Sequence, residues 1–508
     1  MYVNNCFLSL SLLQLLFLAP QRYYIRPLSL FKKMGVPGPR PWPVIGDFFG
    51  QMIRGFWAPD YQVQMMRQYG EVYGVFSGSN PVLMVSDPEM LREIFVKQFH
   101  KFSRRNVSWL FTFIVTVSTC VMSLGEDWKN VRTTLTPAFS SGKLKLMLEQ
   151  LNRCANILAE KVGESAKTGK PFKARELTGG FTMDAIASTA FGTEIDSQGN
   201  PEDPFVIHGK QGLKFDFKNP VVWLFICFPK IMKPILEAIN WDFFPKKSYK
   251  FFESVFDQLM AMRHHGGIER VDFMQLMANA HKEKEEDKED MGEVKVQADV
   301  VSNGILFFLA GYDTTSLTMA YTMYNLALNQ EAQDNVIREV DDVMEGKDDI
   351  DNEALGQLTY LEMCIMETLR LYPPGANVMT RCCVEDAVVN GLSIPKGMTI
   401  LVPIQGIHYD PERWPEPKKF IPERFTKEER EKRNPFHWLP FGAGPRNCIG
   451  MRLAMMEAKI GLAKVFMKYR ILPCAETQVP LKIKKHEVFP AAEDGVMLKA
   501  TPRDKSEN

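Results

Sequence analysis

The chain has 508 residues and a mass of 58.1 kDa, enough for about three domains of ~150 residues or for one large fold. Apolar residues make up 45% and charged residues 24%, which excludes disorder, collagen and coiled coil for the bulk of the chain. The 61 Lys and Arg balance the 61 Asp and Glu, so the net charge does not favour nucleic acid and any charged partner must meet a local patch.

The first predicted element is an apolar segment near the N-terminus, from Cys6 to Ala19. It is shorter than the ~20 residues that cross a bilayer as a helix, and counting from Tyr2 makes its length marginal. The basic residues follow the segment and none precedes it: Arg22, Arg26, Lys32 and Lys33. This charge order predicts a retained single-pass anchor that leaves the rest of the chain in the cytosol, rather than a cleaved signal peptide.

A proline-rich stretch from Gly35 to Pro43 follows the anchor. Because Pro fixes φ and makes the preceding residue extended, this stretch predicts a stiff spacer between membrane and globule, although an ordinary loop fits it too. We therefore expect residues 1–34 to form a membrane anchor with a basic linker, and residues 35–508 to form a single domain.

A hairpin and then a long helical region follow the spacer. Residues 71–86 alternate apolar and polar around Gly78-Ser79-Asn80-Pro81, which predicts a β-hairpin. Between about 87 and 375 apolar residues recur at helical spacing in five stretches: 88–98, 143–165, 247–263, 318–345 and 355–372. The run from Lys282 to Asp290 is almost entirely charged and predicts a solvated, mobile loop.

The last quarter of the chain mixes short strands with irregular structure. Residues 385–404 read as strands around an Asn390-Gly391 turn, whereas 410–445 are rich in Pro, Gly and Trp without periodicity. A helical run over 449–469 and short strands complete the chain. The sequence therefore predicts a fold that is mainly α with small β-sheets, and the irregular stretch needs something other than a regular ladder to hold it.

The stretch from Val300 to Ala327 is apolar nearly all the way round and predicts a buried helix. It contains Gly311 and Asp313 within the run AGYDTT. A Gly inside a helix costs ~1 kcal/mol relative to Ala, and a buried Asp needs a partner. Two such violations together are typical of a functional site, although a kinked core helix with a solvent-facing Asp remains an alternative.

Cysteine chemistry centres on one residue. The nine Cys are an odd number without a C-x-x-C pair, which excludes a disulfide framework and fits a reducing compartment. Cys448 lies in the loop FGAGPRNCIG, which opens onto a predicted helix whose free N–H groups favour a thiolate. Gly442, Gly444 and Gly450 leave room for a flat ligand near the backbone, and Arg446 offers a cationic fork to a carboxylate. The alternative for Cys448 is a free, buried structural Cys.

The pattern F-x-x-G-x-R-x-C-x-G, from Phe441 to Gly450, resembles the haem-binding loop of the cytochrome P450 family of haem-thiolate monooxygenases. The resemblance extends over residues 35–500, with the motifs in the family's order. It implies the cytochrome P450 fold, in which haem b lies between the long central helix and the Cys loop. It also implies that Cys448 is the axial iron ligand, with Phe441 and Arg446 beside the haem, and that residues 35–508 are one catalytic domain.

The run AGYDTT resembles the family's oxygen-activation motif, A-G-x-[DE]-T-T. By that resemblance Gly311 makes room for O2, Thr314 hydrogen-bonds the oxygen being activated or a water, and Asp313 relays protons. A Thr hydroxyl that bonds the carbonyl four residues back also bends a helix locally, which fits a groove over the haem.

Glu367 and Arg370 lie three apart on one helical face and can pair, but a surface pair would be worth almost nothing. They resemble the family's buried E-x-x-R pair, which an Arg from a later P-E-R-F segment completes. The resemblance therefore assigns Glu367, Arg370 and Arg424 to a charge network that holds the irregular stretch 410–445.

Further cations resemble the family's contacts to the haem propionates. Trp128 and Arg132 have the W-x-x-x-R spacing, and both reach a propionate by resemblance. Arg381 is another such contact, and either Arg104 or Arg105 adds one more. For Arg104, Arg105 and Arg381 taken singly, a plain surface role stays open.

Two runs, AGYDTTS from Ala310 and TPAFSSGKLK from Thr136, resemble the animal microsomal branch of the family, in particular its broad-specificity drug- and steroid-oxidising third family. By resemblance the distal pocket walls come from 103–122, 210–245, 303–315, 374–380 and 486–493. Six aromatic residues make these walls apolar, which suits lipophilic substrates: Trp109, Phe111, Phe113, Phe307, Phe308 and Phe489. Each of them fits plain core as well. The apolar stretch 219–245 is expected to dip into the membrane surface.

Electrons must come from outside, because no flavin- or nicotinamide-binding segment is left over in the chain. The resemblance implies an NADPH-dependent flavoprotein reductase, with cytochrome b5 as an optional second donor, on the cytosolic face of the endoplasmic reticulum membrane. An acidic partner fits a basic patch, although each residue of it also fits a solvated surface. The patch comprises Lys129, Arg132, Lys143, Lys145, Arg430, Lys432 and Arg433.

The resulting hypothesis is O2- and reductase-dependent hydroxylation or epoxidation of lipophilic substrates such as steroids or xenobiotics. A peroxide isomerase of the prostanoid-synthase kind is the alternative enzyme, but it needs no proton relay and the intact Asp313-Thr314 step argues against it. A haem-based sensor is the non-enzymatic alternative. A zinc or c-type haem protein is disfavoured, because there is no C-x-x-C-H run and His264 and His265 are adjacent.

Overall fold

The computed structural model describes the greater part of the chain between residues 26 and 503. The residues that it does not describe are 1–25, 44, 48–49, 51–52, 56, 106–125, 201, 213–218, 240, 242–245, 267–292, 377, 486, 488 and 504–508. The predicted anchor, the charged run from Lys282 to Asp290, and the wall residues Trp109, Phe111 and Phe113 lie outside the described residues. Among the helices that are described, none combines the length and the apolar character needed to cross a bilayer.

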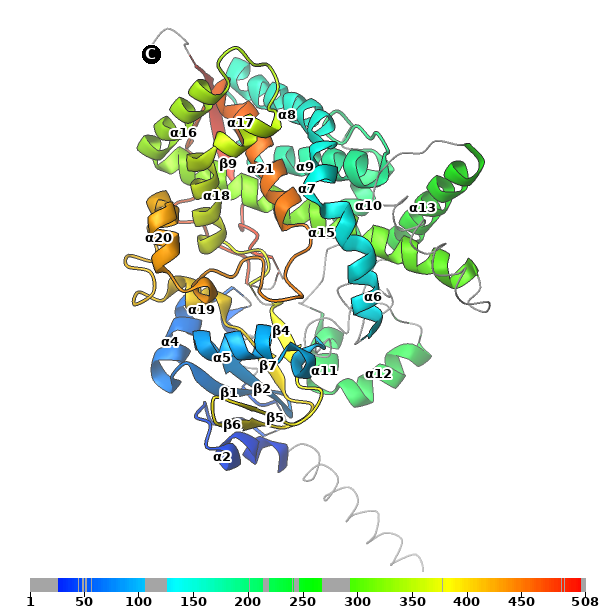
Figure 1. The fold of residues 1–508 in the computed structure, drawn as a ribbon, viewed down its shortest axis with the longest axis vertical. Helices are drawn as coiled ribbons and strands as arrows, with labels where there is room; N and C mark the ends of the chain where they lie inside the picture. The colour runs from blue at the N-terminus through cyan, green and yellow to red at the C-terminus, as the bar shows by residue number, and fades with distance from the viewer. Residues whose placement is uncertain are drawn as a thin grey trace, which may run out of the picture.

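Helices form most of the molecule (Figure 1). The α-helices are α2 (Leu30–Met34), α4 (Pro59–Tyr69), α5 (Pro88–Arg92), α6 (Glu126–Leu135), α7 (Ser141–Lys145), α8 (Leu148–Thr168), α9 (Ala174–Phe191), α10 (Pro204–Gly212), α11 (Pro220–Cys227), α12 (Pro229–Ala238), α13 (Lys246–Gly266), α15 (Glu293–Leu328), α16 (Gln330–Val343), α17 (Asn352–Gln357), α18 (Thr359–Leu371), α19 (Ile404–Tyr409), α20 (Lys427–Lys432) and α21 (Met451–Phe466). Short 3-10 turns are η2 (Arg26–Ser29), η4 (Phe99–Phe102), η6 (Thr136–Phe139), η7 (Pro422–Phe425) and η8 (Pro435–His437), and η3 (Glu93–Lys97) is a π-helix.

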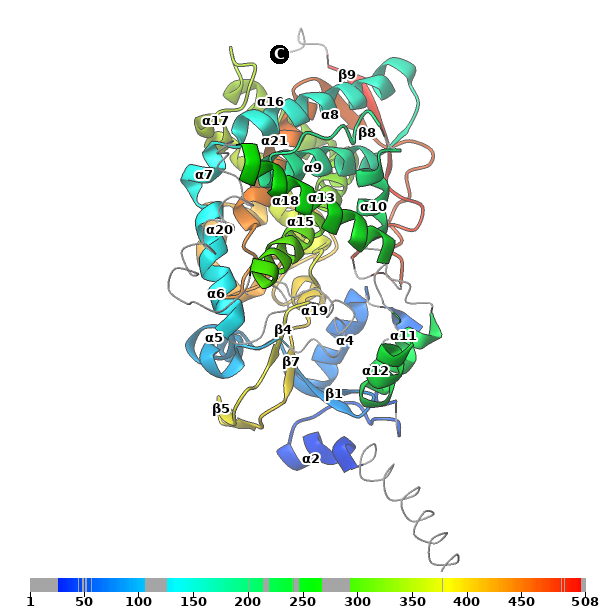
Figure 2. The ribbon, with the colours of Figure 1, turned by 90° about the vertical axis from the view of Figure 1, so that its right-hand side faces the viewer.

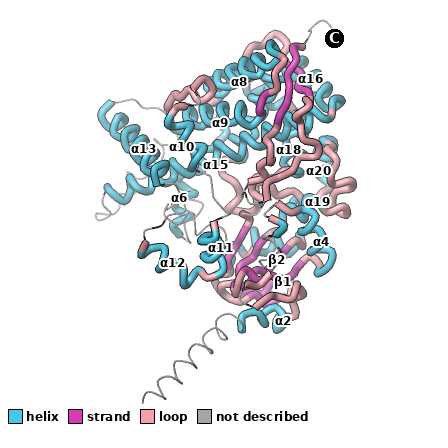
Figure 3. The backbone as a smooth tube through the Cα atoms, turned by 180° about the vertical axis from the view of Figure 1, so that it is seen from behind, coloured by secondary structure: helices cyan, strands magenta, loops and turns pink. Residues whose placement is uncertain are grey.

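The strands form small sheets at the side of the helices, as Figure 3 shows. The largest has the order β1 (Val72–Ser77), β2 (Asn80–Val85), β7 (Thr399–Leu401) and β4 (Thr380–Cys382). A second sheet has the order β3 (Phe172–Lys173), β9 (Met497–Pro502) and β8 (Tyr469–Leu472), and a third pairs β5 (Ala387–Val389) with β6 (Leu392–Ile394). The predicted class, mainly α with small sheets, is confirmed.

Both predicted turns are confirmed. β1 and β2 pair antiparallel from Val72 opposite Val85 to Ser77 opposite Asn80, which leaves Gly78 and Ser79 as the turn. In the β5–β6 hairpin Asn390 and Gly391 both have positive φ, 48° and 81°, as a type I′ turn requires.

The core has two large parts and a small cluster of Met366, Trp414 and Phe425. One part joins the buried faces of α8, α9, α15, α18 and α21, and α15 crosses the middle of the molecule beside α9 (Figures 1 and 2). The other part lies under the β1–β2–β7 sheet and packs against α4, α5 and the first helical turns of the described chain. The predicted buried helix from Val300 to Ala327 is confirmed inside α15.

Three predicted helical stretches are each divided in two. The stretch 143–165 breaks between α7 and α8, 318–345 breaks at Asn329, and 355–372 breaks at Leu358. Apolar residues continue at helical spacing across each break, so periodicity alone predicts one helix. At Leu358 the break is fixed from outside, because the Glu339 carboxylate of α16 accepts the Tyr360 N–H at 2.5 Å and the Leu361 N–H at 2.9 Å.

The proline-rich stretch lies against the sheet instead of standing off as a spacer. Gly74 N–H of β1 donates to the Pro37 carbonyl at 2.8 Å. Asp47 and Phe76 bond twice: Asp47 N–H donates to the Phe76 carbonyl at 2.8 Å, and Phe76 N–H donates to the Asp47 carboxylate at 2.9 Å. The stretch satisfies backbone groups that an edge strand would otherwise expose.

Candidate active site

The Cys448 loop is closed by its own backbone and opens onto α21. Cys448 N–H donates to the Phe441 carbonyl at 2.8 Å, which brings the two ends of the loop together. Burial raises the pKa of the Cys448 thiol, whereas the Gly450 and Met451 N–H groups at the start of α21, together with Arg132 and Arg105, lower it. The side chain is nevertheless exposed. The net effect is a raised pKa, so the N–H donors and cations only partly offset the burial of a sulfur that a ligand can reach.

The glycines of this loop have different tasks. A Cβ on Gly444, whose φ is +72°, would collide with the carbonyl oxygen of Phe95 in η3, so this glycine serves the packing of the loop on η3. The prediction that Gly444 leaves room for a ligand was therefore wrong. A Cβ on Gly450 meets no atom within 4 Å, and one on Gly442 meets only Asn447 Cα at 4.0 Å, so open space lies beside these two residues as predicted.

Three arginines converge near the loop. Arg381 of β4 is fully buried, and burial lowers the pKa of its guanidinium well below the ordinary value, as do Arg105 and Arg446. Its Nη1 donates to the Thr380 carbonyl at 2.8 Å, and the group lies 4.4 Å from the centre of the Phe95 ring. Nε of Arg381 has no hydrogen-bond partner in the part of the chain that the structure describes. A cluster of like charges with such a donor fits an anionic ligand, and the propionates of haem have this charge.

Arg104 and Arg105 have different surroundings, and the sequence left open which of them contacts a propionate. Arg105 Nη2 donates to the Arg446 carbonyl at 3.1 Å, and Arg105 also acts on the pKa of Arg381. Arg104 is exposed, and its backbone pairs with Cys382. Arg105 therefore belongs to the arginine cluster and Arg104 to the surface.

Trp128 and Arg132 of α6 both reach the Cys448 loop, from one face of the helix. Arg446 lies over the Trp128 ring, 4.3 Å from its centre. Arg132 donates to Asn447, to the backbone oxygen at 2.9 Å and to the side-chain oxygen at 3.0 Å. Through these contacts both residues help to fix the conformation of the loop, in addition to any contact with a propionate.

One stripe of α15 is accessible although the helix is buried on its other sides. Ala310 is exposed, and Phe307, Gly311 and Thr314 are half-buried on the same side of the helix. The Thr314 hydroxyl donates to the Ala310 carbonyl at 2.7 Å, as the sequence suggested. A Cβ on Gly311 would lie 3.0 Å from Ile186 Cδ1 of α9, so this glycine also permits the close approach of α9.

Asp313 has the partner that a buried carboxylate needs. Its Oδ1 lies 2.5 Å from Nη2 of Arg175 in α9, and its side chain is only 7% exposed. The alternative of a solvent-facing Asp is therefore wrong. Sequence reasoning missed Arg175, because a lone Arg in the first turn of a helix carries no signal for a partner 138 residues away.

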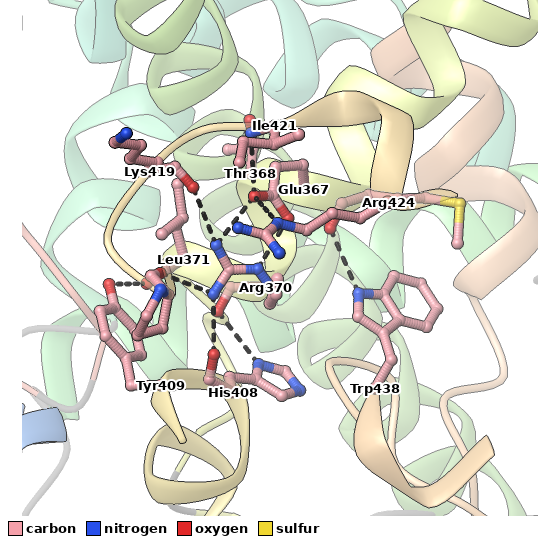
Figure 4. A network of polar contacts seen from close by, with 12 residues as sticks. Glu367, Thr368, Arg370, Leu371, His408, Tyr409, Lys419, Ile421, Arg424 and Trp438 are labelled. Atoms are coloured by element: carbon pink, nitrogen blue, oxygen red, sulfur yellow. Dashed lines mark hydrogen bonds and ion pairs between the residues drawn. The ribbon is translucent and has the colours of Figure 1, made fainter. Parts of the chain in front are cut away.

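Figure 4 shows the network around Glu367 and Arg370, which is buried as the resemblance implied. Arg370 Nε and Nη2 donate to the two Glu367 oxygens at 2.7 and 2.8 Å, and Arg424 Nε lies 3.4 Å from Glu367 Oε1. Arg370 also donates to the carbonyl oxygens of Pro417 and Lys419 in the irregular stretch, and to that of His408 in the last turn of α19. Ile421 N–H donates back to Glu367 at 3.1 Å. The network contacts residues 408–424, which include the first part of the stretch 410–445 that it was predicted to hold.

Phe308 was predicted to line a pocket wall, and this prediction is wrong. It is fully buried, with the rings of Phe205 and Phe252 at 4.8 and 5.1 Å between centres, so it belongs to the core. Phe307 and Phe489 are half-buried and stay available to a wall.

Two members of the predicted basic patch are engaged inside the fold. Arg132 is bonded to Asn447, and Arg433 lies 4.1 Å from the centre of the Trp414 ring and donates to the Arg424 carbonyl at 2.8 Å. Lys432 is exposed but pairs with Glu429 at 2.8 Å. Lys129, Lys145 and Arg430 are exposed, and Lys143 is half-exposed.

A sequence profile described as Cytochrome P450 matches residues 36–500 of this chain. The chain is 38% identical to Cytochrome P450 3A41 of Mus musculus, over 98% of this chain and 99% of that protein. It is 39% identical to Cytochrome P450 3A29 of Sus scrofa, over 94% of this chain and 93% of that protein. It is 38% identical to Cytochrome P450 3A1 of Rattus norvegicus, over 94% of each chain.

Proposed function

Because this chain belongs to the cytochrome P450 family, it is a haem-thiolate monooxygenase, and we propose that it hydroxylates or epoxidises lipophilic molecules such as steroids or xenobiotics. The observation that carries the proposal is the environment of Cys448, an accessible sulfur at the start of α21. Burial raises the pKa of its thiol, and two N–H groups and two arginines oppose that rise. The half-buried Phe307 and the exposed Ala310 supply an apolar surface for such substrates. We further propose residues 35–508 as one catalytic domain.

The cofactor of the family is haem b with a Cys thiolate ligand, and the cationic cluster fits it. When bound, the haem supplies the iron that activates O2 with two electrons from NADPH, delivered by a separate reductase. Cys448 would supply the thiolate that binds the iron, with Phe441 beside it. Arg381, Arg105 and Arg446 would hold the propionates, with Trp128 and Arg132 supporting this end of the site.

Proton delivery is assigned to Asp313 and Thr314. The Thr314 hydroxyl lies on the accessible stripe of α15 and donates its proton to the Ala310 carbonyl at 2.7 Å. Its oxygen can therefore accept a hydrogen bond from a proton donor or from a water. The Asp313 carboxylate is held by Arg175 at 2.5 Å, and Arg175 is 37% exposed, so protons can reach Asp313 from solvent on that side. Gly311 leaves the backbone bare next to Thr314.

The redox partner of the family is a reductase, and we propose that it docks on Lys129, Lys143, Lys145 and Arg430. Cytochrome b5 is proposed as a second donor at the same surface. These side chains are exposed or half-exposed, which a transient electrostatic complex requires.

We propose that the protein is held on the endoplasmic reticulum membrane by a single N-terminal span, with the catalytic domain on the cytosolic face. α11 and α12 lie at the same end of the molecule as α2, which follows the predicted anchor (Figures 1, 2 and 3). These helices expose Leu224, Ile231 and Ile235, and Ile239 is exposed directly after α12. Such a surface suits the interface of a bilayer, through which a lipophilic substrate also arrives.

A Cys448→Ser exchange tests the proposal. We expect the variant to lose both the thiolate signature in the carbon monoxide difference spectrum and substrate-driven NADPH consumption with added reductase, because serine does not supply a thiolate. Cys474→Ser, at a half-buried thiol, is the control and should change neither. An unchanged spectrum in Cys448→Ser would remove the basis of the assignment. Turnover of a peroxide substrate without reductase would instead favour an isomerase, and a panel of steroids, fatty acids and xenobiotics would define the substrate class.

A further inference from the structure

Three polar side chains of α9 face one short segment of α15. Arg175 Nη2 lies 2.5 Å from the Asp313 carboxylate. The Thr178 hydroxyl donates to the Ser316 carbonyl at 2.9 Å, and the Thr182 hydroxyl donates to the Tyr312 carbonyl at 2.9 Å. Positions 175, 178 and 182 fall on one face of a helix, so α9 presents a continuous polar stripe to residues 312–316.

This stripe is buried in the largest part of the core. Thr178 and Thr182 are both 0% exposed. Each hydroxyl also lies within reach of a carbonyl of its own helix, Ala174 at 3.0 Å and Gly179 at 3.2 Å, so its single proton is shared between the two helices. A threonine hydroxyl in a helix can donate its proton to a carbonyl of its own helix. Thr178 and Thr182 both donate to carbonyls of α15 as well, so they fix the position of the α15 backbone, which apolar packing alone does not do.

The two helices approach closely enough for these bonds because both carry glycine at the crossing. A Cβ on Gly179 would lie 3.3 Å from the Tyr312 ring, and a Cβ on Gly311 would lie 3.0 Å from Ile186. Figure 2 shows α9 beside α15 over this region. A larger side chain at either glycine would separate the helices and lengthen the bonds.

The bonds from α9 bracket Thr314. The carbonyls of Tyr312 and Ser316 lie two residues before and two residues after it, and each is held by one threonine. Thr314 itself faces the accessible stripe with its hydroxyl on the Ala310 carbonyl. The α9 bonds therefore fix the direction of the Thr314 side chain from behind, while Arg175 fixes the direction of the Asp313 carboxylate.

We propose that Arg175, Thr178 and Thr182 of α9 are positioning residues for proton delivery, which aim Asp313 and Thr314 without touching substrate or cofactor. The inference rests on the proposed roles of Asp313 and Thr314. Correct delivery consumes NADPH, O2, one proton and substrate RH, and yields ROH, water and NADP+. Misdirected delivery consumes NADPH, O2 and one proton, and yields H2O2 and NADP+, so the H2O2 released per NADPH measures how well the two groups are aimed.

The test compares Thr182→Val and Thr178→Val with Thr182→Ser and Thr178→Ser in the haem-loaded protein with reductase. Valine keeps the shape and removes the hydroxyl, and we expect it to raise the H2O2 released per NADPH about fivefold, the factor that corresponds to one net hydrogen bond. The serine variants keep the hydroxyl and should stay near the wild-type ratio. Thr189→Val is the matched control, because Thr189 is a buried threonine of the same helix that bonds only the Ala185 carbonyl of α9 among the described residues.

A second measurement does not depend on turnover. A double-mutant cycle of Arg175→Gln and Asp313→Asn in urea unfolding should show that the two exchanges are not additive, by about fivefold or more in the unfolding constant. Arg175 is partly exposed, so its variants should fold even if a buried valine variant does not. Arg175→Gln should also raise the H2O2 ratio, and Arg175→Lys should restore it in part.

The outcomes separate this inference from the proposed function. If Thr314→Ala and Asp313→Asn leave the H2O2 ratio unchanged, the proposed proton relay itself is wrong. If those two raise the ratio while the valine variants and Arg175→Gln do not, the relay stands and the positioning role of α9 is overturned. A rise in Thr189→Val as large as in Thr182→Val would also overturn it, because any disturbance of α9 would then suffice.

Discussion

Two groups of arginines, one around the fully buried Arg370 and one around the fully buried Arg381, differ in how their charge is met. Arg370 makes two bonds to the buried Glu367 and three to backbone carbonyls, and Arg424 completes the group. Arg381 instead lies among Arg105 and Arg446, and the structure describes no carboxylate paired with it. The first group is balanced within the protein, whereas in the second the buried Arg381 meets the positive charges of Arg105 and Arg446.

The difference separates a group that holds the fold from one that recognises a ligand. A balanced network satisfies each donor and acceptor when the chain folds, so removing one member leaves a buried charge behind. A buried cluster of like charges lowers the stability of the protein until an anion arrives, so removing one member relieves repulsion and weakens ligand binding. Mutations in the two groups should therefore act in opposite directions on the haem-free protein.

Arg370→Ala should have the largest effect. It leaves Glu367 charged and without its main partner in a fully buried place, which typically costs about 3–5 kcal/mol of the free energy of unfolding. We expect protein that is isolated without haem and unfolds at lower urea concentration. Arg153→Ala is the control, because its ion pair with Glu194 is half-exposed and should contribute less than about 1 kcal/mol. Normal haem content in Arg370→Ala would show that the network is not needed to hold the irregular stretch.

Arg381→Met should have the next largest effect, on haem and not on folding. Methionine fills a similar volume but carries no charge. Burial, Arg105 and Arg446 all disfavour the charge of Arg381, so the haem-free variant should unfold no more easily than wild type. Haem affinity should fall about ten- to hundredfold, as expected for one lost hydrogen bond to a charged group. Titration of haem-free protein with haem measures the affinity, and Arg104→Met, at an exposed neighbour, should change neither quantity. A destabilised haem-free Arg381→Met protein would contradict the comparison.

The balanced group also predicts a pH effect through His408. Leu439 N–H donates to His408 Nε2 at 3.0 Å, so Nδ1 carries the proton toward the Arg370 carbonyl at 3.1 Å and the ring is neutral. Burial, and then Arg370, lower the pKa of His408 from 6.5 to about 3. The unfolded chain binds the proton first as pH falls, so stability is complete above about pH 6.5 and is lost by up to ~1.4 kcal/mol per unit below it.

Urea unfolding of wild type and His408→Asn between pH 7 and about pH 5 measures this contribution as a difference in slope. The variant should lose stability less steeply as the pH falls, although it starts from a lower value at pH 7 because it lacks the ring. Parallel curves would mean that His408 is not held neutral by the network.

Features written in a local pattern could be predicted from the sequence. The β1–β2 turn follows from Gly78 and its neighbours, and the pair Glu367 and Arg370 follows from a spacing of three on a helix. Cys448 stands out because a glycine-rich loop opens directly onto a helix. Each of these features is fixed by residues within about ten positions of one another.

Features that depend on contacts between distant segments could not be predicted in this way. Arg175 meets Asp313 only because α9 and α15 pack together, and nothing near Arg175 in the sequence indicates it. The choice between Arg104 and Arg105 depends on which side of an extended segment faces inward, since adjacent residues point to opposite sides. The break at Leu358 depends on Glu339 of another helix.

Reversing both Lys143 and Lys145 to Glu should have the smallest effect. Unlike the two arginine groups, these lysines are surface charges, neither paired among the described residues nor buried. Lys145 is exposed and Lys143 is half-exposed, on α7, whose Ser141 hydroxyl accepts a hydrogen bond from Arg452 in the first turn of α21 at 3.4 Å. Because such charges are screened over ~10 Å at 0.1 M salt, we expect reductase-supported turnover to fall severalfold at low ionic strength and to recover as salt is added. Haem content and unfolding should stay as in wild type, in contrast to Arg370→Ala and Arg381→Met.

Reversal of Lys167 and Lys170, two exposed lysines at the far end of α8, is the matched control. Equal losses in both double variants, or a loss that salt does not relieve, would mean that α7 does not attract the reductase.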